Sequence, residues 1–194
     1  DRYNWHRHLL SDWLLANSHA SGVGWEPYPL SLRIVNWIKW DLADGQLSDA
    51  CRTSLFSQAL TLEKNIEYHI LGNHLFSNAK ALMFVGYFFE GKMGKVFLNQ
   101  ANKIFERELI EQFLEDGGQF ELSPMYTGMA VFDILDLINI GRITSCNENS
   151  EQDTYLCRIA QRGLFWLQIM SHPDGDVSFF NDSSKGIAQN IFPS

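Results

Sequence analysis

Apolar residues recur at intervals of three and four along most of this 194-residue chain, in segments separated by short breaks rich in Gly, Pro or Asn. This spacing places apolar side chains on one face of an α-helix, which repeats every 3.6 residues. We therefore expect a nearly all-α protein. The predicted helices cover 5–16, 29 to about 42, 48–70, 74–90, 95–115, 127–140 and 154–171.

Local residues mark several of the predicted helix ends. Pro29 can open a helix because the missing N–H has no partner in a first turn, and Ser48 is a candidate N-cap. Gly72 interrupts the pattern between the third and fourth helices. After 171 the pattern changes to a turn at 173–176 and strand-like residues at 177–180, so helix packing is predicted to stop there.

The helical pattern leaves the architecture open. Enclosed and amphipathic helices joined by short breaks are compatible with a bundle, a helical repeat array or a toroid of helical hairpins. The sequence shows no self-similarity at a fixed period, which weakens the repeat interpretation. The length suits one domain with a substantial core.

Charge and cysteine content exclude several classes of protein. A net charge of −8 and a pI near 5.1 argue against unspecific nucleic-acid binding, which needs many Lys and Arg. The cysteines at 51, 146 and 157 lack CxxC spacing, so we expect free thiols. No apolar run approaches the ~20 residues of a membrane span. The chain opens without a signal-like segment, so its first residues do not indicate a compartment.

Histidine spacing gives no support for a metal site. His6 and His8 fall on different helix faces, and His69 and His74 lack a neighbouring carboxylate or Cys cluster in the sequence. No P-loop, dinucleotide fingerprint, GxSxG or HExxH motif occurs. We therefore expect no metal and no cofactor.

The segment 24–33 joins two predicted helices and carries two aromatic side chains. Two prolines stiffen a loop that bears Trp25 and Tyr28, and Arg33 follows one turn into the helix. Together with Trp37, these rings are candidates for stacking against a sugar. The alternative is a hydrophobic loop that holds two helices together.

Two further segments carry polar residues at predicted helix starts. Asn73 and His74 open the most enclosed helix, whose positive dipole end favours an anion; otherwise Asn73 is an N-cap and His74 a buried, bonded histidine. A glycine turn at 116–118 leads to Glu121 and to Tyr126, which is otherwise an amphipathic cap residue. Arg33 and Lys80 are candidates for binding substrate charge or are solvated surface residues.

Four ordered blocks of the chain resemble the heparinase II/III family of polysaccharide lyases. They are GWEPYPLSLRIVNWIKW (24–40), GNHLFSNAKAL (72–82), DGGQFELSPMY (116–126) and HPDGDVSFFND (172–182). The resemblance implies an incomplete (α/α) toroid of helical hairpins at 1–171, with 172–194 as a linker or first strand toward a β-sandwich domain outside this chain. It also implies β-elimination of uronic-acid-containing polysaccharides and a periplasmic or secreted location.

The resemblance also implies site residues. Asn73 matches the asparagine that neutralises the uronate carboxylate, Tyr126 matches the tyrosine proton donor or acceptor, and His74 adjoins the carboxylate site. A further catalytic histidine comes from the β-sandwich domain in the family. Relatives often follow the tyrosine with His, where this chain has Thr127.

Substrate contacts are expected from Trp25, Tyr28, Arg33, Trp37 and Lys80, and Glu121 is expected to support its loop because a carboxylate repels an anionic substrate. The expected partners are an acidic polysaccharide and the β-sandwich domain. Two alternatives stay open: a non-catalytic glycan-binding helical module and a helical protein-interaction scaffold.

Overall fold

The computed structural model of the chain describes residues 2–17, 19–70, 72–145 and 150–187. These residues form helices and connecting turns without a strand, apart from two isolated bridges, so the all-α prediction is confirmed. The elements are α1 (Arg2–Ala16), the 3₁₀ turn η1 (Val23–Trp25), α2 (Pro27–Trp40), the π turn η2 (Asp41–Gly45), α3 (Asp49–Lys64), α4 (Gly72–Phe88), α5 (Gly91–Gln112), α6 (Pro124–Ser145) and α7 (Glu151–Ile169).

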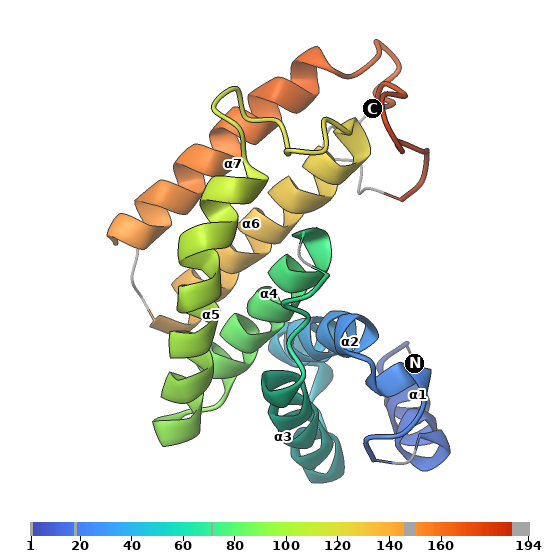
Figure 1. Cartoon of the computed structure of the whole chain (residues 1–194). Helices are drawn as coiled ribbons and strands as arrows, with labels where there is room; N and C mark the ends of the chain where they lie inside the picture. The colour runs from blue at the N-terminus through green and yellow to red at the C-terminus, as the bar shows by residue number, and fades with distance from the viewer. Residues whose placement is uncertain (1, 18, 71, 146–149, 188–194) are drawn as a thin grey trace. The chain divides into compact units, whose positions relative to one another are not determined.

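The chain divides into two compact units, 1–105 and 106–194, and the boundary falls within α5. In the first unit, α2 packs against α4 and α3 (Figure 1). The apolar face of α2 is fully buried at Leu30, Ile34 and Ile38. Helix α4 is buried at every position from 75 to 86, as expected of a helix that is apolar on all sides.

Helix α2 begins at Pro27, two residues before the predicted start, with proline in the first turn as expected. The N-cap prediction for Ser48 is confirmed, because its side chain accepts a hydrogen bond from the backbone N–H of Cys51 (3.3 Å). The cap fixes the start of α3.

The predicted end of the third helix is wrong. Helix α3 stops at Lys64 rather than near residue 70, and Asn65 leaves helical geometry with φ −125° and ψ 32°. The backbone N–H of Glu67 then donates to the side chain of Asn78 (2.9 Å) instead of to a helical carbonyl. A tertiary hydrogen bond thus ends a helix that local periodicity would extend.

Helix α1 is longer than the predicted 5–16 and contains no buried residue. It contacts the chain after α2 through its polar atoms: Tyr3 donates to the carbonyl of Ala43 (3.3 Å), and Arg7 donates to that of Gly45 (3.3 Å). The amphipathic face predicted there therefore contributes partly covered rings rather than core residues.

In the second unit, α6 and α7 lie side by side as a hairpin (Figure 1). Gly163 of α7 permits the close approach, because a Cβ there would lie 2.3 Å from Cγ2 of Val131 on α6. After α7, the turn predicted at 173–176 forms, and it is closed by a hydrogen bond from the N–H of His172 to the carbonyl of Asp176 (2.8 Å). The division at 171/172 into a toroid and a linker stays a prediction.

Cys51 and Cys157 are free thiols, whereas Cys146 lies outside the described residues. Among the helices that the structure describes, none is both long and apolar enough to cross a membrane. The described residues also contain no group of three or more His, Cys, Asp or Glu side chains arranged to hold a metal ion.

Candidate active site

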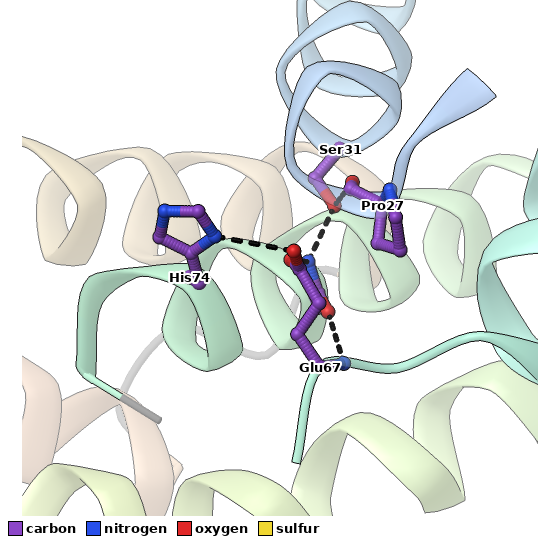
Figure 2. Close-up of polar contacts among 5 residues, drawn as sticks. Pro27, Ser31, Glu67 and His74 are labelled. Atoms are coloured by element: carbon purple, nitrogen blue, oxygen red, sulfur yellow. Dashed lines mark hydrogen bonds and ion pairs between the residues drawn. The ribbon is translucent and has the colours of Figure 1, made fainter. Parts of the chain in front are cut away.

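His74 lies in the first turn of α4 and contacts a buried carboxylate. Its Nδ1 is 3.2 Å from Oε1 of Glu67, which belongs to the segment between α3 and α4 (Figure 2). The Glu67 side chain is 9% exposed and the His74 side chain 33% exposed. The imidazole therefore joins a buried anion to a partly open surface, and it is not the buried histidine of the alternative interpretation.

Asn78 holds Glu67 from the other side. Its Nδ2 donates to Oε2 of Glu67 (3.1 Å) and to Oγ of Ser31 (3.1 Å), and its Oδ1 accepts from the backbone N–H of Glu67 (2.9 Å). Ser31 in turn donates to the carbonyl of Pro27 (2.8 Å) (Figure 2). The buried polar groups of this cluster are thus bonded to one another, which removes most of the cost of burying them.

The ring of Tyr28 fixes the plane of His74 by stacking. The two ring centroids are 4.3 Å apart, and the planes are inclined by 21°. Tyr28 was a candidate for stacking on a sugar, and in the structure one of its faces is occupied by the imidazole. The stacking on Tyr28 and the contact with the Glu67 carboxylate together leave the His74 side chain little rotational freedom.

Asn73 precedes His74 in the first turn of α4 and is partly exposed. It lies within the helix rather than at its N-cap, and its side chain makes no hydrogen bond to another described residue. Gly72 has φ +57°, and a Cβ added there would meet no described atom within 4 Å. An amide that has no partner among the described residues and lies at the positive end of a helix is suited to receive an anionic group.

The two candidate indole rings, those of Trp25 and Trp37, lie in a separate cluster around Trp13 of α1. Trp37 is 7% exposed and packs at 90° on Trp13, with centroids 5.5 Å apart, and Trp25 is 8% exposed. The guanidinium of Arg33 lies over the Trp13 ring at 4.1 Å, and its Nε donates to Oε1 of Gln58 (2.9 Å). These rings therefore offer little free surface to a sugar.

Arg33 is a desolvated cation rather than a solvated surface residue. Burial lowers the pKa of Arg33 to about 10, so it remains charged at neutral pH. Its Nη2 is buried without a hydrogen-bond partner among the described atoms, as is Nε1 of Trp25. Lys80 is also buried, at 6% exposure, with Nζ 5.8 Å from the centroid of the Phe84 ring.

A pocket of about 620 Å³ lies in the first unit and shares Pro27 and Glu67 with the His74 cluster. Its wall combines carboxylate, amide, hydroxyl, imidazole and apolar groups, a mixture typical of sites for polar ligands. The lining residues are Ala20, Trp25, Glu26, Pro27, Thr61, Asn65, Ile66, Glu67 and His69.

Tyr126 belongs to the second unit, in the first turn of α6. Its backbone N–H donates to Oγ of Ser123 (3.4 Å), which caps the helix. The residue is partly exposed, and its phenolic hydroxyl has no hydrogen-bond partner among the described residues. The helix start thus holds the backbone of Tyr126, while its phenolic oxygen has no partner in the part of the chain that the structure describes.

Thr127, at the position where the family resemblance implies a histidine in many relatives, is a structural residue. It is fully buried; its hydroxyl donates to the carbonyl of Ser123 (3.0 Å) and accepts from the backbone N–H of Gln119 (3.1 Å). Both hydrogen-bonding directions of the hydroxyl are therefore used inside the protein. Thr127 is therefore a residue of the protein interior.

Glu121 is tied into its own loop. Gln119 donates from Nε2 to Oε1 of Glu121 (3.3 Å) and accepts at Oε1 from the backbone N–H of Glu121 (2.9 Å). Gln119 also donates to Gln112 (3.1 Å), which donates to the buried carboxylate of Glu108 (3.2 Å). These bonds agree with a role of Glu121 in supporting the loop before Tyr126.

The structure brings His74 and Tyr28 into contact, and Asn73 precedes His74 in the chain. Asn73 and His74 belong to the first unit and Tyr126 to the second, so their convergence on one cleft stays a prediction. Sequence reasoning missed Glu67 and Asn78. The sequence signal that could have found Asn78 is its spacing, because it lies four positions after His74 and hence on the same face of the helix.

Two solved structures share this fold. A heparinase III has a TM-score of 0.63 at 21% identity, over 89% of this chain and 30% of its own. Heparan sulfate lyase HepC from Pedobacter heparinus has a TM-score of 0.64 at 23% identity, over 92% of this chain and 29% of its own. The chain therefore has the all-α fold of the helical toroid domains of heparinases.

Sequence comparison gives the family. The family model for the heparinase II/III N-terminus matches residues 47–192. The chain therefore belongs to the heparinase II/III family. The heparin-sulfate lyase of Bacteroides stercoris is 32% identical over 117 residues, which are 60% of this chain and 17% of that protein. The chain thus spans less than a fifth of that relative.

Proposed function

We propose that the protein to which this chain belongs is a polysaccharide lyase that cleaves a uronic-acid-containing glycosaminoglycan by β-elimination. Membership of the heparinase II/III family carries the proposal. The names of the relatives, heparin-sulfate lyase and heparan sulfate lyase, suggest a glycan of the heparan sulfate type as the first substrate to test.

Asn73 is proposed to neutralise the uronate carboxylate, with His74 beside it. Removing the proton α to a carboxylate places a second negative charge on the same group, so the enzyme must supply preorganised donors there. In support, the side-chain amide of Asn73 has no partner among the described residues, and His74 is held by Glu67 and Tyr28. Both side chains stand at the positive end of α4.

Tyr126 is proposed as the general acid or base. A base removes the C5 proton, the C4–O bond breaks with formation of a C4=C5 double bond, and the departing oxygen takes up a proton. In support, the hydroxyl of Tyr126 has no described partner, while its backbone is fixed at the start of α6. A β-sandwich domain of the same protein is proposed to supply the further histidine.

The test is the ultraviolet absorbance of unsaturated uronate, measured with the full-length protein on a panel of acidic glycans. We expect release of this product from wild type and its loss in Asn73→Ala and Tyr126→Phe. The 194-residue chain alone is expected to show weak or absent activity. Binding of several glycans without this product would favour the non-catalytic glycan-binding module, and absence of binding would favour the protein-interaction scaffold.

A further inference from the structure

We propose that Glu67 is a positioning residue that fixes the tautomer of His74, with the proton on Nδ1 and with Nε2 left for the substrate. Its consequence for catalysis rests on the proposed lyase function. The assignment of the proton itself rests only on the hydrogen bonds among the described residues.

The direction of each hydrogen bond in the cluster follows from Asn78. Its Oδ1 accepts from a backbone N–H, that of Glu67, so the amide orientation is set (2.9 Å). The two hydrogens of Nδ2 then go to Oγ of Ser31 and to Oε2 of Glu67, both at 3.1 Å. The remaining contact of the carboxylate is Oε1 to Nδ1 of His74 (3.2 Å). A carboxylate accepts but does not donate, so Nδ1 carries the proton.

The contact between Nδ1 and Glu67 also fixes the position of the second ring nitrogen of His74, Nε2. The imidazole cannot turn over, because Tyr28 stacks on it at 4.3 Å and Glu67 holds Nδ1. Nε2 lies on the side of the ring away from Glu67 (Figure 2) and has no hydrogen-bond partner among the described residues. With the side chain 33% exposed, Nε2 is the ring atom left for a ligand.

This arrangement determines what His74 can offer to a uronate carboxylate. With Nδ1–H bonded to Glu67, Nε2 presents a hydrogen only as the imidazolium, whose positive charge is partnered by the Glu67 carboxylate. Hydrogen bonds from a charged donor are roughly twice as strong as neutral ones. Their benefit is largest in the transition state, where the second negative charge develops, so the effect belongs in kcat rather than in KM.

Glu67→Gln reverses the tautomer while keeping the shape of the side chain. Asn78 still directs a donor at residue 67, so the new amide oxygen must face Asn78, and its NH₂ group must face Nδ1 of His74. Nδ1 then has to accept, and the proton moves to Nε2. The ring becomes a neutral donor, because an imidazolium would place two donors against one another.

The first measurement is ¹⁵N NMR of the full-length protein labelled at histidine, under conditions where the ring is neutral, with His74→Gln to assign the signals. We expect the Nδ1–H tautomer in wild type and the Nε2–H tautomer in Glu67→Gln. A wild-type His74 with its proton on Nε2 would overturn the proposal, and this measurement does not require lyase activity.

The second measurement is the lyase rate on heparan sulfate. We expect Glu67→Gln to lower kcat by about 100-fold with little change in KM. The matched control is Glu90→Gln, an exposed carboxylate between α4 and α5 that lies outside the pocket lining and outside the His74 cluster, which should retain wild-type kcat. An unchanged kcat in Glu67→Gln, or an equal loss in both variants, would overturn the positioning role. Absence of lyase activity in wild type together with the Nδ1–H tautomer would refute the proposed function and leave the proton assignment standing.

Discussion

The side-chain oxygens of Ser123 and Ser183 lie 2.8 Å apart although the residues are sixty positions apart in the chain. The Ser183 hydroxyl also accepts from the backbone N–H of Met125 (3.3 Å), at the start of α6. Asn181 donates to the carbonyls of Glu121 and Leu122 (3.1 and 3.2 Å). The chain after α7 therefore caps the helix that carries Tyr126.

Ser183→Ala should loosen the first turn of α6. The substitution removes the acceptor for Met125 N–H and a partner of Ser123, so we expect a loss of about 1 kcal/mol in unfolding free energy. Hydrogen exchange should accelerate at the amides of Met125 and Tyr126. Asp182→Ala, an exposed neighbour, is the control. Equal exchange rates in both variants would show that the tail does not stabilise this helix end.

Asn73→Ala and Asn78→Ala should separate function from stability on one helix. Asn78 is fully buried, and its loss leaves Glu67 N–H and Glu67 Oε2 without their partner and removes a donor to Ser31 Oγ, so we expect a cost of about 2–4 kcal/mol. Asn73 has no described partner, so Asn73→Ala should change stability by about 0.5 kcal/mol or less. Urea denaturation measures both, and a similar cost for the two variants would contradict the assignment.

Thr127→Ala should destabilise the second unit more than Thr127→Ser. Alanine leaves the backbone N–H of Gln119 without an acceptor in a buried site, which costs about 1–3 kcal/mol. Serine keeps the hydroxyl and loses only a methyl group, at about 1 kcal/mol. If thermal and chemical denaturation rank serine below alanine, the hydroxyl is not what this position requires.

Gly163→Ala should force α6 and α7 apart. The added Cβ would lie 2.3 Å from Cγ2 of the fully buried Val131, and overpacking of this kind costs about 1–3 kcal/mol. Val131→Ala removes the obstructing methyl groups, so the double variant should be more stable than the sum of the single effects. A double-mutant cycle measures the coupling, and strict additivity would show that the two residues do not contact.

Much of the candidate site follows from the sequence only in outline. Asn73, His74 and Tyr126 were expected at helix starts, and the structure places them in the first turns of α4 and α6. Their chemical roles stay predictions. The partners that hold His74 were not predicted, because Glu67 and Ser31 come from other segments and their contacts depend on how α2, α3 and α4 pack.

Local interactions account for what the sequence determined by itself. The helical pattern, the cap at Ser48 and the turn at 173–176 each depend on residues within about four positions of one another, and all are present. Tertiary packing decided the rest. It ended α3 at Lys64 by bonding Glu67 to Asn78, and it buried Trp37 against Trp13. Burial and long-range hydrogen bonds depend on which segments meet, and a one-dimensional pattern does not specify that.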